Sequence, residues 1–403
     1  MILFLLVRRR LRQHAVASVI SAFSVALAGG LMLTVWMVRD QSRRAFSGAA
    51  TGFDAVLGAR GAKLQLVLNA VFHLEASPGN LKWEDYQEIR DHPAVELAVP
   101  LALGDNYRGF RIAGTTLDYF ERAEPAPGRR FKLREGGRWF DTLRREAVVG
   151  SFAARKLGLR VGDKFHPYHG LAFDEEHAHE EDYLVVGVLE PSNTPADRVI
   201  WIPLAGVQNM SGHDPAAASD LSAVLVKLRG GSPLAGFQLD QYYNRQGTRL
   251  TWAWPIGRVV AELFDKLAWL ERVLTVVTAL VAVVAGASIM AGLYNAMHAR
   301  RRDLAILRAL GARRGTVFMA TWLEAVCIAA GGIVGAFPIY LICMTGVAVV
   351  LRASTGVVLD LWTWHPVMIW GPVVLVGLGG LAGVAPAVLA YRTEVGRHLA
   401  PVT

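Results

Sequence analysis

Residues 273–315 decide the fold. The stretch Val273–Met297 reads VLTVVTALVAVVAGASIMAGLYNAM and is followed directly by His298–Gly315, which reads HARRRDLAILRALGARRG. The first stretch has no Asp, Glu, Lys or Arg and exceeds the roughly 20 apolar residues that cross a bilayer as a helix. Because lipid offers the backbone no hydrogen-bond partner, we predict a membrane-spanning helix followed by a short basic turn at the membrane surface.

Three further segments share this composition: Ala15–Val38, Ala325–Leu351 and Pro366–Tyr391. The chain of 403 residues is 53% hydrophobic and 19% charged, whereas soluble domains are about 45–50% apolar and about 25% charged. This composition excludes a purely soluble protein and a disordered one.

The chain has two cysteines, Cys327 and Cys343, and both lie in apolar runs. This number and placement exclude a disulfide scaffold and a cysteine zinc finger.

Arginines predict the orientation of the four spans. They lie before the first span, between the second and third, and after the fourth: Arg8, Arg9, Arg10, Arg12, Arg300, Arg301, Arg302, Arg308, Arg313, Arg314, Arg392 and Arg397. The positive-inside rule then places both termini in the cytoplasm of a bacterium, with a multi-pass protein in its inner membrane. Arg39, Arg43 and Arg44 oppose this weakly, because they begin a long translocated region. The first span is too long for the apolar core of a signal peptide, so we expect an uncleaved anchor.

The residues between the first two spans predict a large α+β domain on the periplasmic side. Helical spacing predicts helices over Leu81–Asp91 and Ser151–Leu157, and one that starts near Pro255 and continues into the second span as a stalk. β-branched and apolar runs predict strands over Glu146–Gly150, Val161–Phe165, Tyr183–Leu189 and Arg198–Ile202, and a half-buried strand over Leu221–Leu228.

The predicted fold class is therefore a membrane α-helical protein of four transmembrane helices, with this domain inserted between helices 1 and 2. Its parts are a cytoplasmic N-terminus (1–14), helix 1 (15–38), the periplasmic domain with stalk (39–266), helix 2 (267–297), a cytoplasmic turn (298–315), helix 3 (316–351), a short periplasmic loop (352–365), helix 4 (366–391) and a cytoplasmic tail (392–403).

The cytoplasmic turn predicts a short amphipathic helix. Leu304, Leu307 and Leu310, with Ile306, form an apolar stripe among basic residues, and Gly311 is placed to end the helix. Such a helix has three uses: it lies on anionic lipid, it caps the helix bundle, or it docks into a groove of a partner protein.

The turn resembles the signature of FtsX/MacB-type ABC transporter permeases, over Asp303–Gly315 and then Thr321–Ala325. Asp303-Leu304-Ala305 stands where the family usually has Glu-Ile-Gly, which keeps the polarity pattern. In this family the region forms the coupling helix that contacts the ATPase subunit. The resemblance therefore assigns ATPase coupling to Asp303, Leu304, Ile306, Leu307, Arg308, Leu310 and Gly311.

The resemblance extends over most of the chain. Val148–Asp163 and Val185–Val188 are similar to the family's periplasmic core, and the order of one span, a large domain and three spans is the same. It implies two permease copies with two cytoplasmic ATPases that hold ATP and Mg²⁺, and a periplasmic partner or lipoprotein. The chain has no Gly-Lys pair and so no phosphate-binding loop of its own. Its basic residues flank membrane spans, so no nucleic-acid partner is expected.

Small residues predict where the helices pack in lipid. Gly331 and Gly335 in the third span, and Gly379 and Gly383 in the fourth, have the spacing that lets helices approach closely, within one copy or between copies. Glu324 lies near the start of the third span. We expect it to reach headgroup water or a basic residue such as Arg314.

Histidines cluster in the predicted periplasmic domain, at His166, His169, His177 and His179. Imidazole and carboxylate suit zinc, so these four are candidate ligands, and a solvated loop between two strands is the alternative. Leu57–His73, Gly114–Tyr119 and this loop are similar to a MacB-like subgroup associated with zinc acquisition in Gram-negative bacteria. Two other functions stay open: an FtsX-like regulator of periplasmic cell-wall hydrolases, and a membrane metalloenzyme that uses the histidine loop.

Overall fold

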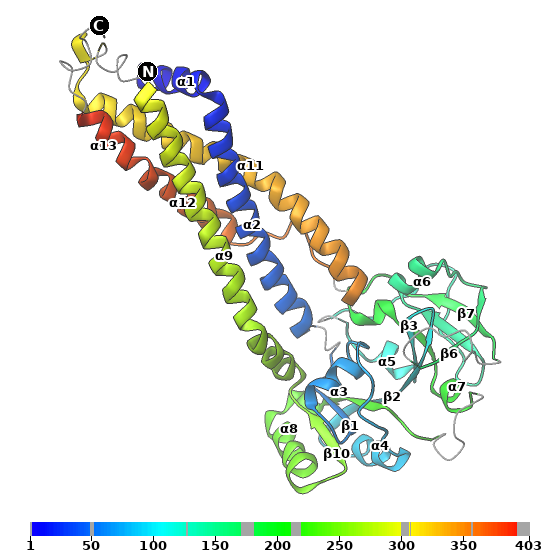
Figure 1. The fold of residues 1–403 in the computed structure, drawn as a ribbon. Helices are drawn as coiled ribbons and strands as arrows, with labels where there is room; N and C mark the ends of the chain where they lie inside the picture. The colour runs from blue at the N-terminus through cyan, green and yellow to red at the C-terminus, as the bar shows by residue number, and fades with distance from the viewer. Residues whose placement is uncertain are drawn as a thin grey trace. The chain divides into compact units, whose positions relative to one another are not determined.

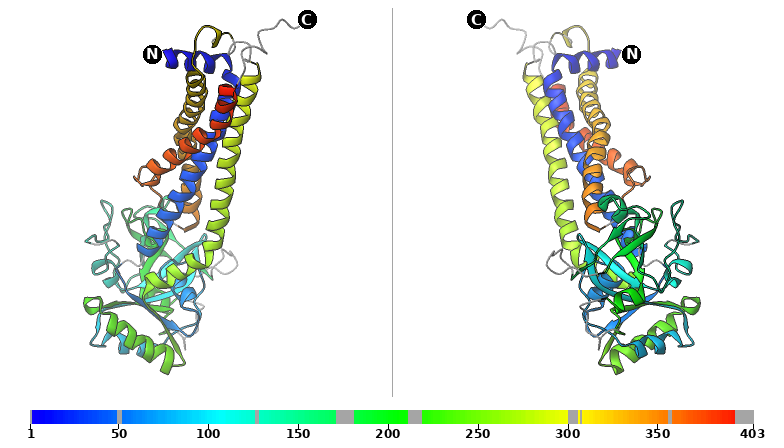
Figure 2. Two further views of the ribbon diagram at one scale, coloured as in Figure 1. Left: turned by 90° about the vertical axis from the view of Figure 1, so that its left-hand side faces the viewer. Right: turned by 90° about the vertical axis from the view of Figure 1, so that its right-hand side faces the viewer.

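The computed structural model describes residues 2–48, 52–125, 128–170, 181–210, 219–299, 306, 308–355 and 358–392. The chain divides into two compact units. Unit 1 comprises Met1–Gln41, Ala268–Val349 and Asp360–Thr403, and unit 2 comprises Ser42–Leu267 and Val350–Leu359. Unit 1 is helical, and unit 2 holds the sheet (Figures 1 and 2).

The long helices confirm the predicted membrane architecture. They are α1 (Ile2–Gln13), α2 (Ala15–Gly48), α9 (Ile256–Ala299), α11 (Arg314–Thr355), α12 (Val367–Ala382) and α13 (Val384–Arg392). Within them, four stretches are long and apolar enough to cross a membrane: Ala15–Arg44, Ala268–His298, Arg314–Ala353 and Val367–Arg392. The third stretch begins at Arg314, well before the uncharged apolar run that starts at Ala325. Helix α11 already includes the residues from Arg314 to Glu324.

Two features of the helical unit were not predicted from composition: a separate N-terminal helix and a break in the fourth span. The N-terminal residues form α1, which runs across the end of the bundle at a large angle to α2 (Figures 1 and 2). The fourth span is divided into α12 and α13 at Gly383. Pro386 accounts for this break, because its ring lacks an N–H and clashes with the carbonyl four residues earlier.

Two of the predicted glycines pack α12 against α11. A Cβ atom at Gly379 would lie 2.5 Å from the Cβ of Ala329, and one at Gly383 would lie 2.4 Å from the Cβ of Ala325. Both distances are too short for carbon atoms, so these positions admit only glycine without a shift of the backbone. The packing is within one copy of the chain.

In the third span, Gly335 packs closely within one copy of the chain and Gly331 does not, so packing of Gly331 between copies stays a prediction. A Cβ at Gly335 would lie 3.1 Å from the Cβ of Ala26 on α2, whereas one at Gly331 would have no atom within 4 Å. The close contact with α2 is made by Gly332, where a Cβ would lie 2.6 Å from the carbonyl oxygen of Ala22. Successive residues of a helix point in directions about 100° apart, so Gly331 points away from α2 when Gly332 points toward it.

Unit 2 is built on one mixed sheet, covered by short helices. Its elements are β1 (Ala55–Ala59), α3 (Lys63–Ala70), α4 (Trp83–Arg90), β2 (Val95–Tyr107), β3 (Phe110–Thr115), α5 (Asp118–Glu121), β4 (Glu146–Val149), α6 (Ser151–Leu157), β5 (Lys164–Phe165), β6 (Tyr168–His169), β7 (Tyr183–Val188), β8 (Ile200–Pro203), α7 (Leu204–Gln208), β9 (Ala223–Leu228), α8 (Pro233–Asp240) and β10 (Leu250–Ala253). The strand order is β10-β1-β9-β2-β3-β8-β4-β7-β5, and β6 pairs with β2.

The long strand β2 joins the two halves of this sheet. Its first half pairs with β9, and its second half pairs with β3 and β6. The pairs β3–β8 and β4–β7 are parallel, and the others are antiparallel. An α+β domain of this kind between the first and second spans confirms the predicted fold class.

Strand β9 is buried on both faces, so the prediction of a half-buried strand is wrong. Val224 and Val226 belong to one hydrophobic core, and Ala223 and Leu225 belong to another on the opposite face. Ser222 and Lys227 give this stretch its alternating look, but the four residues between them are all apolar, as in a central strand covered by helices on both sides of the sheet.

Two predicted strands are shorter than expected. β5 begins at Lys164 because Gly162, with φ of 99°, forms a turn. Arg198 lies in the 3₁₀ helix Pro195–Arg198, and the strand starts only at Ile200.

The turn from β4 to α6 depends on Gly150. A Cβ there would lie 2.4 Å from the carbonyl oxygen of Asp197 and 2.5 Å from that of Ala196. The Asp197 carboxylate fixes this segment, because it accepts hydrogen bonds from the backbone N–H groups of Ser192 (3.0 Å) and Asn193 (2.9 Å). Burial raises the pKa of Asp197, and these hydrogen bonds counteract that shift.

We predict that Gly150→Ala lowers the free energy of unfolding of the inserted domain by about 1–3 kcal/mol, because the methyl group overpacks against fixed backbone. Gly104→Ala is the matched control, since a Cβ at Gly104 meets nothing within 4 Å. Pulse proteolysis in urea measures both variants. Equal stability of the two would contradict the steric argument.

Candidate functional site: the turn between α9 and α11

The turn lies between the second and third candidate spans, which end at His298 and begin at Arg314. Its described residues are Ile306 and those from Arg308 onward. Leu310 donates its backbone N–H to the carbonyl of Ile306 (2.9 Å), and Gly311 donates to Arg308 (3.0 Å). Gly311 has φ of 97°, the left-handed conformation that ends helices. The predicted helix end at Gly311 is therefore confirmed.

The described part of the turn exposes large apolar side chains. Leu310 is 80% exposed and Ile306 is 41% exposed. Residues four apart lie on the same face of a helix, so the two form one apolar edge outside the membrane spans. Of the other predicted coupling residues, Asp303, Leu304 and Leu307 lie outside the described part of the chain, and Arg308 is half-buried.

Three helices meet at the base of the turn. Val317 at the start of α11 and Ala390 of α13 are buried against each other, with Met297 of α9 packed on them. The Arg314 guanidinium lies 5.9 Å from the ring centroid of Tyr391, within the range of a cation–π contact. The helix ends next to the turn are therefore packed against one another.

A buried ion pair ties α1 to α11 in the same unit. Arg10 is 9% exposed and Glu324 is 3% exposed. The Arg10 Nη1 lies 4.0 Å from the Glu324 Oε2 and donates a 3.4 Å hydrogen bond to the Thr321 Oγ1. Burial lowers the pKa of the Arg10 guanidinium, and the charge of Glu324 counteracts this shift.

Glu324 reaches a basic residue, as expected, but this residue is Arg10 and not Arg314. Glu324 and Arg314 are ten positions apart on one helix, which is about 15 Å along its axis. Arg314 turns toward Tyr391 instead. The sequence offered four arginines in α1 as alternative partners, and nothing in their order distinguishes Arg10 from its neighbours.

Helix α9 belongs to both units. Ile256, Val259 and Val260 in its first turns are buried in the core of the inserted domain. The same helix runs without a break from Ile256 to Ala299, 44 residues in all, and ends at the turn. This continuity is what the predicted stalk requires.

Ion pairs join α2 to α9 on the part of α2 that follows the first apolar run. Arg39 lies 2.9 Å from Glu271, and Arg43 lies 3.2 Å from Asp265. Both arginines opposed the predicted orientation. Because each has an acidic partner on α9, neither is an uncompensated charge.

The histidine cluster is not assembled by the described residues. His166 Nδ1 lies 3.2 Å from Asp182 Oδ1, whereas His169 Nδ1 lies 3.4 Å from Asp105 Oδ1. Each histidine thus pairs with a different carboxylate, and within the described ranges no three His, Cys, Asp or Glu residues form a group that could hold a metal ion. His177 and His179 lie outside the described residues.

Two family models match the chain. Residues 15–238 match the MacB-like periplasmic core domain, and residues 275–395 match the FtsX-like permease C-terminal domain. The chain belongs to the FtsX/MacB-type ABC transporter permeases. The permease is therefore a multi-pass membrane subunit and not an enzyme, which excludes the metalloenzyme alternative. Its family works with a cytoplasmic ABC ATPase.

Solved structures of two relatives are similar to the inserted domain of the permease. The periplasmic region of MacB from Actinobacillus actinomycetemcomitans is 14% identical, covers 54% of this chain and 94% of its own, and has a TM-score of 0.36. The extracellular domain of the ABC-type transporter YknZ from Gram-positive bacteria is 15% identical, covers 49% of this chain and 97% of its own, and has a TM-score of 0.31. No curated protein matches the permease.

We predict that Arg10→Met lowers the free energy of unfolding of the permease in detergent by about 3 kcal/mol, because Glu324 is then a buried charge without its partner. Arg9→Met, an exposed neighbour in α1, is the control. Thermal denaturation compares the two, and the double variant Arg10→Met/Glu324→Met should regain part of the loss. Equal melting temperatures for Arg10→Met and Arg9→Met would contradict a stabilising pair.

Proposed function

We propose that the permease transmits ATP hydrolysis by a separate cytoplasmic ATPase to motion of its inserted domain. In this proposal it lies in a bacterial inner membrane with both termini in the cytoplasm and the inserted domain in the periplasm. It works as two copies with two ATPases. The observation that carries the proposal is α9, one uninterrupted helix that starts in the core of the inserted domain and ends at the turn.

Two other helices support the same proposal. The last residues of α2, from Ser42, and the last residues of α11, from Val350, group with unit 2, although both helices form membrane spans in unit 1. A helix resists bending and stretching through its backbone hydrogen bonds, so a displacement at one end reaches the other. Three such connections suit transmission of motion better than transport through a fixed channel.

The turn is the surface that we assign to the ATPase. It is basic, it stands on a packed base, and it exposes Ile306 and Leu310 beyond the membrane spans. Amphipathic helices with such an edge dock into grooves of partner proteins. The concentration of arginines on this side supports its cytoplasmic location.

The periplasmic partner is proposed more coarsely. A substrate-carrying protein or a lipoprotein fits a domain of this size, which is larger than a regulator of cell-wall hydrolases needs. A transporter and a regulator of cell-wall hydrolases would both depend on contact between the turn and the ATPase. The test of that contact therefore applies to both functions.

We predict that Leu310→Asp abolishes co-purification of the permease with its ATPase, with affinity reduced at least about tenfold, because a charge replaces the more exposed of the two apolar side chains, Ile306 and Leu310, that the structure describes in the turn. Leu143→Asp is the matched control, since Leu143 is 92% exposed but lies in the inserted domain. Membrane insertion should be unchanged in both. Undiminished co-purification of Leu310→Asp would reject the assignment of the turn.

A link to zinc remains a separate hypothesis. It is supported by the contacts of His166 and His169, whose Nδ1 atoms each face a carboxylate, as in many zinc-bound histidines. Titration calorimetry of the full-length permease with zinc chloride should give saturable heat that is lost in the variant His177→Ala/His179→Ala. Absence of heat in the wild type would remove the hypothesis, and ATPase coupling should be the same in both proteins.

A further inference from the structure

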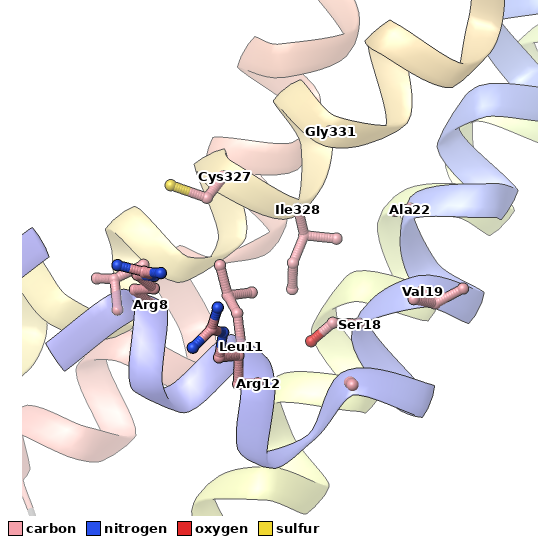
Figure 3. Close-up of a pocket in the computed structure, with 11 residues that line it drawn as sticks. Arg8, Leu11, Arg12, Ser18, Val19, Ala22, Cys327, Ile328 and Gly331 are labelled. Atoms are coloured by element: carbon pink, nitrogen blue, oxygen red, sulfur yellow. The ribbon is translucent and has the colours of Figure 1, made fainter. Parts of the chain in front are cut away.

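A cavity of about 500 Å³ lies between α1, α2 and α11 in unit 1. Figure 3 shows Arg8, Leu11 and Arg12 on the α1 side, with Cys327, Ile328 and Gly331 on α11 opposite them.

The interior of the cavity is apolar. Leu11, Val19 and Ile328 line it, together with small residues of α2 and α11. Gly331 widens it, because a Cβ at this position would meet no atom within 4 Å. The glycine that sequence reasoning assigned to helix packing therefore borders an open space.

The α1 side of the cavity carries two positive charges. Arg8 and Arg12 are four residues apart, which places them on one face of α1, and both line the cavity. Residues 1–39 contain no acidic residue. Among the described residues no ion pair joins Arg8 or Arg12 to a carboxylate, whereas the neighbouring Arg10 is turned to Glu324.

We propose that this cavity binds one anionic phospholipid. The phosphate of the headgroup is held by Arg8 and Arg12, and acyl chain fills the apolar space beside Leu11 and Ile328. Basic pockets between membrane helices recognise anionic headgroups, and guanidinium groups match phosphate oxygens in geometry as well as charge.

A second copy of the chain is the other occupant that an apolar cavity on a membrane helix suggests. In a two-fold contact the same surface of each copy meets the other. Arg8 and Arg12 of both copies would then approach one another, and like charges in an interface oppose association. A lipid phosphate supplies the opposite charge, so the charge pattern favours lipid.

Bound lipid has a consequence for the helices around it. It fills the space between α1 and α11 on the side of α1 that does not carry Arg10. Together with the Arg10–Glu324 pair, it fixes α1 against the third span from two directions. The proposal is independent of ATPase docking and of the substrate.

Native mass spectrometry tests the proposal on the full-length permease, released from nanodiscs of phosphatidylcholine with and without phosphatidylglycerol. The wild type should retain one phosphatidylglycerol, and Arg8→Gln and Arg12→Gln should each weaken retention about fivefold. Arg9→Gln, which removes the same charge from α1 but not from the cavity, is the control. Equal retention by all variants, or equal retention of phosphatidylcholine by the wild type, would overturn the proposal.

A second pair of variants separates occupancy of the cavity from charge. Gly331→Leu should fill the space and reduce retention of phosphatidylglycerol to the level of Arg8→Gln. Gly346→Leu on the same helix, where a Cβ also meets nothing within 4 Å, should leave it unchanged. Unchanged retention in Gly331→Leu would place the lipid elsewhere and overturn the assignment.

The two cysteines distinguish lipid from a second copy. Cys327 lines the cavity and Cys343 does not. Phosphatidylglycerol should slow the reaction of Cys327 with a membrane-permeant maleimide relative to that of Cys343, and Arg8→Gln/Arg12→Gln should remove this difference. Oxidative cross-linking of Cys327 to Cys327 of a second copy would show a protein contact instead and would overturn the proposal.

Discussion

A bilayer leaves the peptide backbone without water, so every N–H and C=O group that crosses it must find its partner within the protein. The other features of this permease depend on that constraint. It confines the crossing segments to helices and excludes the sheet from the membrane. In the sequence, the strands and irregular loops lie between α2 and α9, outside the candidate membrane spans. The constraint also favours an unbroken α9 over the candidate span Ala268–His298, which contains no proline. Helix α9 is thus one helix from the core of the inserted domain to the turn.

Once the spans are helices, their association depends on close contact. Lipid chains are as apolar as leucine, so burial of apolar surface gives little advantage in a membrane. Contact between α11 and α12 at Gly379 and Gly383, and between α2 and α11 at Gly332, brings backbones together where no Cβ atom separates them. Where α1 contacts α11, the helices are held by polar contacts and not by close backbone approach. There a buried arginine, a glutamate and a threonine hold α1 against α11.

The sequence predicted features that depend on long patterns or on one special residue. The four spans, the α+β domain, the continuous α9 and the helix end at Gly311 all belong to this group. It failed where the answer depended on direction around a helix or on a partner far away in the chain. Gly331 and Gly332 are indistinguishable in a pattern of small residues, yet they face about 100° apart. Several arginines in the sequence were candidate partners for Glu324. The second buried face of β9 depends on the helices that cover both sides of the sheet, which the pattern of β9 alone does not reveal.

The pairing of α1 with α11 has a consequence for biogenesis. Arg10 is translated 311 residues before Thr321, which at bacterial rates of synthesis corresponds to roughly 15 to 60 seconds. During that interval the ribosome synthesises the first span, the inserted domain and the second span, which all lie between α1 and α11 in the chain. Arg10 can reach its buried position only after the third span has arrived. Helix α1, translated long before α11, therefore takes its final place only late in the synthesis of this chain.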